Sequence, residues 1–476
     1  MEKILITTPI YYVNDRPHIG HAYTTIAADV LTRFFRLQGK QVFFLTGTDE
    51  HGAKVADTAE KLGKSPKDFC DENSEKFKQV WSSLGIKYDY FIRTTDERHE
   101  QAVKKFVDKL KQKGAIYEKE YEGLYCKGCE KFLLEKDLSD GVCPDHQTKP
   151  EKISEKNYFF KLEEHLKQVG DLIKDNKIKI NPDYANKETI GLLNQNLEDF
   201  SISRQKVKWG IDLPFDEKQT VYVWVDALLN YISAIGYGDN DEQFKEWWTD
   251  SRTIHLLAKD ILKFHAIFWP ALLLAGGEKT PDSEFIHGFF TINGQKMSKT
   301  LGNVIDPNDL IKQFGVDATR YLLLSQFPFG QDGDIKQEKF IEKYNSDLAN
   351  GLGNLVARVV TLLAKTENVG TEIDSKVKEV LKSAKDNCNK SMENFEIYEA
   401  LGEIWKIISF CDGYINETKP WVLVKEDLEK FNGVISNLVY AISEISNLIS
   451  PFLPETSERI KNQIKEKKSE ILFPRI

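Results

Sequence analysis

The chain has 476 residues, of which 41% are hydrophobic and 29% are charged, a balance typical of a folded globular protein with room for about three domains. Its formal net charge of −9 at pH 7 excludes a general attraction to nucleic acid, so any RNA contact must depend on local basic or aromatic patches. The longest apolar run, residues 266–277, is too short to span a membrane.

The N-terminus and the cysteines indicate where the protein works. Residues 1–10 lead directly into a strand and lack the basic region and long apolar stretch of a signal peptide, so we expect a cytoplasmic protein. In that compartment the six cysteines indicate metal binding or thiols, not disulfides.

The first fifty residues predict a βαβ unit. Residues 4–6 form a short apolar run, rich in β-branched side chains, that we expect to be a buried strand stopping at Pro9. Residues 26–35 carry apolar side chains at three- and four-residue spacing, which predicts an amphipathic helix. Residues 42–45 are continuously apolar, as a second parallel strand should be, and they lead into a polar turn at residues 46–52.

Two histidines bracket a glycine at the start of the predicted helix, namely His18, Gly20 and His21. In a parallel α/β sheet, ligands bind outside the carboxyl ends of the strands, where a helix N-terminus offers unpaired N–H groups and a partial positive charge. Gly20 permits close approach of a ligand, and the imidazoles can donate hydrogen bonds to phosphoryl oxygens. The alternative is that His21 only starts the helix and His18 packs.

Residues 126–146 contain two pairs of metal-binding side chains. Cys126 and Cys129 are separated by two residues, and Cys143 and His146 have the same spacing. Three thiolates and one imidazole complete a tetrahedral shell around zinc and leave no position for a reactive water. We therefore predict one structural zinc ion, with scattered buried cysteines as the alternative.

The strand-then-helix pattern returns in the second half of the chain. Residues 220–225 and 254–257 predict two further buried strands, which lead to Asp226 and Asp260 respectively. A parallel sheet that resumes after the zinc-binding residues implies a nucleotide-binding fold split by an insertion.

A lysine-rich segment follows a predicted hairpin. Residues 289–292 and the Asn-Gly turn at 293–294 lead into residues 296–300, KMSKT, which contain Lys296 and Lys299. Two lysines in five residues are usually a solvated surface, so this segment alone is weak evidence for a site.

The last third of the chain predicts a helix bundle. Residues 350–363, 403–414 and 435–448 carry apolar stripes at helical spacing. Pro451 and Pro454 mark the end of the last of these segments.

Residues 17–21, PHIGH, and residues 296–300, KMSKT, together resemble the two signature motifs of the class I aminoacyl-tRNA synthetases. Thr300 replaces the usual final serine and retains a hydroxyl group. Within this class the sequence resembles the methionyl-tRNA synthetase family over essentially the whole chain, in its bacterial form with a single zinc knuckle. Further matching stretches are residues 8–14, 47–52, 201–204, 221–231, 259–261 with 264–265, and 419–421.

The resemblance implies an α/β fold with a doubly wound, Rossmann-like nucleotide-binding domain, split by a zinc-bearing insertion and followed by an all-α helix bundle. The expected domains are the first catalytic half at 1–116, the insertion at 117–219, the second catalytic half with the lysine loop at 220–325, a linking segment and anticodon-binding domain at 326–465, and a tail at 466–476.

The resemblance also implies the reaction and its residues. ATP and L-methionine, with Mg²⁺, give methionyl-adenylate and pyrophosphate, and methionine then passes to the 3′ end of tRNA(Met). The expected catalytic residues are His18, His21, Lys296 and Lys299, and ATP is expected to contact His18, Gly20, His21, Asp260 and Lys299. The expected methionine-binding residues are Ile10, Tyr12, Asp49, Trp224, Ala227, Leu228, Tyr231, Ile261 and His265, with Asp49 on the ammonium group.

The same resemblance implies that Asn354, Arg358 and Trp421 read the anticodon. Packing and salt bridging on a helical surface are the alternative for these residues. Because the chain ends at Ile476 without an appended tRNA-binding or dimerisation domain, a monomer is expected.

Other assignments explain less of the chain. A nucleotidylyltransferase shares the His-x-Gly-His motif but needs neither a zinc insertion nor a helical C-terminal domain. Leucyl, isoleucyl and valyl relatives carry a larger editing insertion, and the cysteinyl relative binds its substrate on an active-site zinc although no cysteine lies near His18. A non-catalytic tRNA-binding protein on this fold would be expected to lose motif residues, and both motifs are intact.

Overall fold

The computed structural model describes residues 1–476 except 15, 127, 129–130, 134, 136–137, 145–147, 293, 298–302, 367–368 and 371. The chain forms two compact units. The first unit contains residues 1–17, 39–80 and 87–287, and the second contains residues 18–38, 81–86 and 288–476. The domain boundaries expected from the sequence remain predictions.

A parallel six-stranded sheet forms the centre of the first unit, in the order β3-β2-β1-β12-β13-β7. Every neighbouring pair is parallel, which confirms the doubly wound fold class. Strand order reverses between β1 and β12, and such a switch point is where ligand crevices form. The strands are β1 (Lys3–Tyr12), β2 (Gln41–Asp49), β3 (Tyr90–Arg93), β7 (Lys179–Asn181), β12 (Arg252–Ala258) and β13 (Ser283–His287).

Helices contribute the apolar side chains of one face to the core of this unit. Helix α4 (Glu97–Gln112) buries Val103, Phe106 and Leu110 at helical spacing. Helix α10 (Trp269–Gly276) packs closely against it, because a side-chain carbon on Gly276 would lie 2.7 Å from the Phe106 ring. Other helical segments are α2 (Ala53–Lys61), α3 (Pro66–Ser83), which reaches into the second unit, α5 (Glu163–Lys174), α6 (Asp183–Leu193), α8 (Asn230–Ser233), α9 (Asp241–Phe244), η2 (Lys245–Thr249), η3 (Lys259–Ile261) and η4 (Phe264–Phe268).

Two predicted strand ends were wrong. Strand β1 continues past Pro9 to Tyr12, and β2 continues into the predicted polar turn as far as Asp49. Pro9 is tolerated because it lies where the β1–β2 register shifts, between Thr7 and Ile10, so that its missing N–H group interrupts no regular ladder.

The predicted strand at residues 220–225 was also wrong. Strand β11 (Asp216–Val221) includes only the first two residues of this segment, and it pairs antiparallel with β9 (Ser203–Arg204) and β10 (Asp212–Leu213) in a separate small sheet. Residues from Val223 onwards form helix α7 (Val223–Leu228). A short apolar run fits a buried strand or a buried helical turn equally well, and only the surrounding structure decides.

The predicted insertion contains a second sheet, which is antiparallel and has the order β5-β4-β6-β8. Its longest pairing joins β4 (Ile116–Cys126) to β6 (Glu151–Phe160). Strands β5 (Lys131–Leu133) and β8 (Phe200–Ser201) complete it.

The second unit begins with α1 (Ile19–Leu37) and also holds the predicted hairpin. Strand β14 (Phe290–Ile292) pairs antiparallel with β15 (Gln295–Lys296) and parallel with β16 (Gly333–Ile335), which confirms the hairpin. Asp29 of α1 forms a buried ion pair of 2.7 Å with Arg320 of α12 (Val316–Leu324). This pair joins helices that are distant in the sequence.

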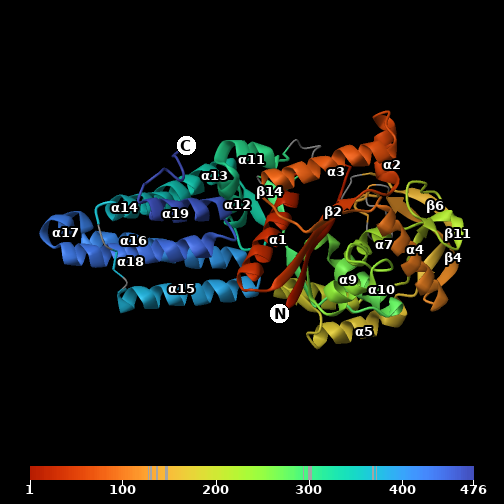
Figure 1. The fold of residues 1–476 in the computed structure, drawn as a ribbon. Helices are drawn as coiled ribbons and strands as arrows, with labels where there is room; N and C mark the ends of the chain where they lie inside the picture. Colours follow the sequence, from red (N-terminus) through yellow and green to blue (C-terminus); the bar gives the residue numbers. More distant parts are fainter. Residues whose placement is uncertain are drawn as a thin grey trace. The chain divides into compact units, whose positions relative to one another are not determined.

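The last third of the chain is helical, as predicted. Helices α14 (Asn354–Leu363), α16 (Ile397–Thr418), α18 (Leu428–Ile449) and α19 (Pro454–Glu466) run side by side (Figure 1). The remaining segments are α11 (Pro307–Phe314), α13 (Gln337–Lys343), η5 (Tyr344–Gly353), α15 (Ser375–Glu393) and α17 (Pro420–Glu426). None of the helices in the described part of the chain combines the length and apolar character needed to cross a bilayer.

Candidate active site

A cavity of about 190 Å³ opens in the first unit at the carboxyl ends of β1, β2 and β12. It gathers every residue that was expected to bind methionine, although these residues are spread over most of the first unit's sequence. Its lining is Pro9, Ile10, Tyr12, Asp49, Gly128, Val223, Trp224, Ala227, Leu228, Asn230, Tyr231, Ile261 and His265. Pro9, Gly128, Val223 and Asn230 were not expected from the sequence.

Hydrogen bonds determine which atoms of the cavity residues His265 and Tyr231 carry protons. His265 Nδ1 lies 3.0 Å from the carbonyl oxygen of Ile261 and therefore carries the proton that this contact needs. Burial lowers the pKa of His265 to about 4, so the ring is neutral at pH 7 and Nε2 is an acceptor. The Tyr231 hydroxyl, 2.8 Å from Nε2, donates to it. Both polar groups are thus satisfied within the protein.

Aromatic rings form another wall of the cavity. The Trp224 ring stacks on Phe264 with a centroid distance of 4.2 Å and an interplanar angle of 10°. Tyr231 also packs on His255 at 4.3 Å. Asp49, at the end of β2, contributes a nearly buried carboxylate to an otherwise aromatic and apolar lining.

In the second unit, His18 and His21 form the N-terminal end of helix α1, which we call the helix mouth. His18 is the N-cap of α1: its Nδ1 accepts from the backbone N–H of Gly20 at 3.1 Å, and its own N–H donates to His21 Nδ1 at 3.1 Å. The two rings stack with centroids 3.8 Å apart. This is a capping box with imidazoles in place of the usual side chains.

These hydrogen bonds fix the protonation of both rings. Burial lowers the pKa of His18 to about 4, and burial together with the neighbouring His18 lowers the pKa of His21. Each ring is therefore neutral at pH 7, and since Nδ1 accepts a hydrogen bond, the proton is on Nε2. Each Nε2 is consequently a donor.

The lysine segment can be described only in part. Lys299 lies outside the described residues, as does the side chain of Lys296, whose backbone ends β15. Met297 approaches the helix mouth closely, because a methyl group on Gly20 would lie 3.3 Å from Met297 Cε and 2.9 Å from His18 Cε1. Glycine is therefore the residue that fits at position 20.

The structure describes three of the remaining residues predicted to bind ATP or zinc. Asp260 is exposed in the turn η3 that directly follows β12. Cys126 and Cys143 are buried together in a small apolar cluster with Leu133. Cys129 and His146 lie outside the described residues. Two buried thiols in one cluster fit a structural metal site closed to solvent.

The predicted anticodon residues lie on the helices of the second unit. Asn354 is exposed at the start of α14. Arg358 donates to Asp412 at 3.0 Å. Trp421 on α17 is 48% exposed, which is unusual for so large an aromatic residue and argues against a core role.

Models of two protein families match the chain. The family described as tRNA synthetases class I (M) matches residues 4–152 and 134–360, and the anticodon-binding domain of tRNA ligase matches residues 374–474. Together they define the chain as a class I aminoacyl-tRNA synthetase with an anticodon-binding domain.

Relatives that match nearly the whole chain identify the family within this class. A methionine–tRNA ligase from Thermotoga maritima is 43% identical over 97% of this chain and 75% of its own length, and one from Clostridium tetani is 45% identical over 96% and 73%. The structure of Mycobacterium tuberculosis methionyl-tRNA synthetase in complex with methionyl-adenylate has a TM-score of 0.93 and 34% identity, covering 100% of this chain and 99% of that one. The chain belongs to the methionine–tRNA ligase family, whose members join methionine to tRNA in an ATP-dependent reaction.

Proposed function

We propose that the cavity of the first unit binds methionine and that the helix mouth and the lysine loop act on the phosphates of ATP. The observation that carries this proposal is that Trp224, Tyr231, His265 and Asp49 line one cavity. Aromatic rings suit a thioether, and a carboxylate suits an ammonium group. Because Tyr231 and His265 already satisfy each other, an apolar side chain can enter without leaving either of these two buried groups unpaired.

ATP binding would use the second set of residues. The Nε2 donors of His18 and His21 and the N-terminus of α1 suit phosphate oxygens, because each neutral ring carries its proton on Nε2 and the helix N-terminus has a partial positive charge. Lys296 and Lys299 would neutralise the leaving phosphates, Gly20 would admit the nucleotide, and Asp260 would accept from the ribose hydroxyls. Mg²⁺ accompanies ATP and offsets its charge.

The chemistry balances with these groups. A carboxylate oxygen of methionine forms a bond to the α-phosphorus of ATP, and the bond from that phosphorus to the bridging oxygen breaks, so that pyrophosphate leaves with the electron pair. A ribose hydroxyl at the 3′ end of tRNA(Met) then attacks the methionyl carbonyl and releases AMP. Charge accumulates on phosphate oxygens in the first step, so positioned donors stabilise its transition state.

The other predicted sites support this activity without taking part in the chemistry. A zinc ion on Cys126, Cys129, Cys143 and His146 would stabilise the fold near the end of β4. Asn354, Arg358 and Trp421 would contact the anticodon, Trp421 by stacking on a base. We further propose a monomer that works in the cytoplasm, where charged tRNA is consumed.

Exchange of labelled pyrophosphate into ATP tests the methionine pocket, since this reaction needs no tRNA. Trp224→Ala should raise the methionine KM by about tenfold or more, because both buried area and sulfur–aromatic contact are lost. Trp247 is a matched control, because it is also a partly buried tryptophan of the first unit but packs against Phe43 at a tilted angle and does not line the cavity. If Trp247→Ala and Trp224→Ala raise the methionine KM equally, the pocket assignment is wrong.

A further inference from the structure

We propose that His51, Asp226 and His99 are positioning residues that fix the walls of the methionine pocket and thereby set the affinity for methionine. None of the three lines the cavity. The inference rests on the pocket proposed above and adds a buried network behind it.

Asp226 is the hub of this network. Its side chain is 1% exposed on α7, between the cavity residues Trp224 and Ala227. One carboxylate oxygen lies 2.7 Å from His51 Nδ1 and the other 2.6 Å from His99 Nε2. A carboxylate can only accept, so both nitrogens carry protons and donate. Burial alone would raise the pKa of Asp226, but the two histidines outweigh it and hold that pKa below its usual value.

Each histidine connects α7 to another wall of the cavity. His51 comes two residues after Asp49, in the turn that follows β2. His99 lies on α4, and its Nδ1 is 2.7 Å from Ser233 Oγ at the end of α8, the helix that carries Tyr231. The Asp226 carboxylate therefore joins three stretches that supply Asp49, Trp224 and Tyr231 to one pocket.

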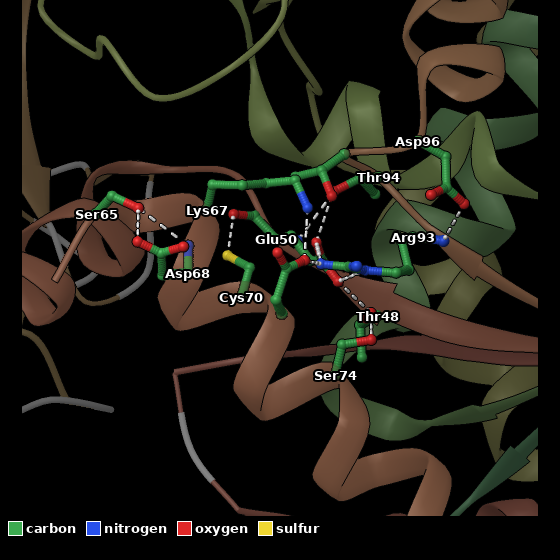
Figure 2. A network of polar contacts seen from close by, with 12 residues as sticks. Thr48, Glu50, Ser65, Lys67, Asp68, Cys70, Ser74, Arg93, Thr94 and Asp96 are labelled. Carbon is green, nitrogen blue, oxygen red and sulfur yellow. Dashed lines mark hydrogen bonds and ion pairs between the residues drawn. The ribbon is translucent and has the colours of Figure 1, made fainter.

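The turn that carries His51 is held rigidly on its other side. Figure 2 shows Glu50 between Arg93 and Thr48: both carboxylate oxygens accept from the Arg93 guanidinium at 2.7 and 2.8 Å, and the Thr48 hydroxyl donates at 2.7 Å. The Trp209 indole N–H also donates to the Glu50 carbonyl at 2.6 Å. Because these contacts anchor the turn, the hydrogen bond from His51 to Asp226 fixes the position of α7 relative to the turn.

The charges around His51 favour a charged donor. Burial would lower the pKa of His51, but Asp226, Glu100 and Glu50 together raise it above its usual value. Hydrogen bonds to charged groups contribute more than neutral ones. Loss of one donor from Asp226 leaves part of a buried carboxylate unpaired, so α7 or the turn must shift.

Two pairs of substitutions separate this role from general stability. The amide nitrogen of asparagine can replace His Nδ1, and that of glutamine can replace the more distant Nε2. His51→Asn and His99→Gln should therefore retain the donor to Asp226, whereas His51→Gln and His99→Asn should lose it. We expect the latter two to raise the methionine KM by about 10- to 100-fold, with the kcat and the ATP KM little changed, because the methionine contacts are lost equally in the ground and transition states.

The measurement is pyrophosphate exchange by the full chain, alongside its thermal unfolding temperature. Thr189→Val is the matched control, because it removes a buried hydrogen bond of the first unit, to Ala185 at 2.8 Å, away from the cavity. The inference is overturned if the methionine KM follows the unfolding temperature instead of the retained donor, or if the ATP KM rises equally. If Trp224→Ala leaves the methionine KM unchanged, the pocket assignment itself fails, and this inference fails with it.

Discussion

Replacement of Glu284 by glutamine should make the stability of the protein less sensitive to alkaline pH. Glu284 is fully buried on β13 in the first unit, and neither carboxylate oxygen has a hydrogen-bond partner among the described residues. Burial raises the pKa of this carboxyl from 4.5 to about 8. The native protein therefore holds a neutral carboxylic acid at pH 7.

The sign of the effect follows from proton binding. The native state binds this proton more tightly than the unfolded chain, so the contribution of Glu284 to stability is fully present below pH 4.5 and is lost as the pH rises through about 8. The loss is about 1.4 kcal/mol per pH unit. Over the interval between the two pKa values it reaches about 5 kcal/mol, which is a large part of the stability of a typical domain.

Urea unfolding at pH 5, 7 and 9 measures this contribution as a difference between Glu284→Gln and the parent protein, which cancels the other titrating groups. The two proteins should be similar at pH 5, and the variant should be more stable by several kcal/mol at about pH 9. Glu155→Gln is the matched control, because Glu155 is also buried but accepts a hydrogen bond from Asn157 at 3.1 Å. Parallel pH profiles for Glu284→Gln and the parent would refute the reasoning.

Three further substitutions test the other proposed sites. Lys299→Ala should slow adenylate formation by about 10²- to 10³-fold with little change in methionine affinity, as measured by single-turnover kinetics; an unchanged rate would contradict its role. Elemental analysis should find one zinc ion per chain, and Cys143→Ala should remove it and lower the unfolding temperature. Trp421→Ala should weaken tRNA aminoacylation about 5- to 150-fold without affecting pyrophosphate exchange, whereas Tyr440→Ala, at another exposed aromatic residue, should affect neither.

Local patterns in the sequence predicted much of the fold. The helix at residues 19–37 and the neighbouring parallel strands follow from apolar periodicity. The helical last third follows from the same signal. Such patterns succeed because the spacing of apolar residues reflects which face each element buries, whatever the element packs against.

The misassigned segment at residues 220–225 shows the limit of such patterns. Val223 and Val225 are β-branched and buried, yet they lie in α7. Helix α7 is short and is stabilised by the packing of its apolar side chains and by Asp226, which binds two histidines. Tertiary contacts outweigh the β propensity of two valines, because that propensity differs by at most about 1 kcal/mol between residues.

The residues of the candidate pocket were predicted through family resemblance, and the network behind it was not. His99 and Asp226 are 127 positions apart in the chain, and His51 and Asp226 are 175 apart. No local spacing connects them. The only sequence signal was that Asp226 follows a run of apolar residues, where a charged side chain requires a partner.

Asp226 and Glu284 show that the protonation state of a buried carboxyl group depends on its surroundings. Both are buried in the first unit, but Asp226 accepts two hydrogen bonds, which lower its pKa, and Glu284 has no partner among the described residues, so burial raises its pKa. The contribution of Asp226 to stability is therefore lost as the pH falls below about 4, and that of Glu284 is lost as the pH rises toward about 8. The raised pKa of His51 adds a further loss as the pH rises above 6.5. These three groups together favour the folded first unit at mildly acidic pH, so Glu284→Gln should flatten the alkaline side of the stability profile and leave the acid side unchanged.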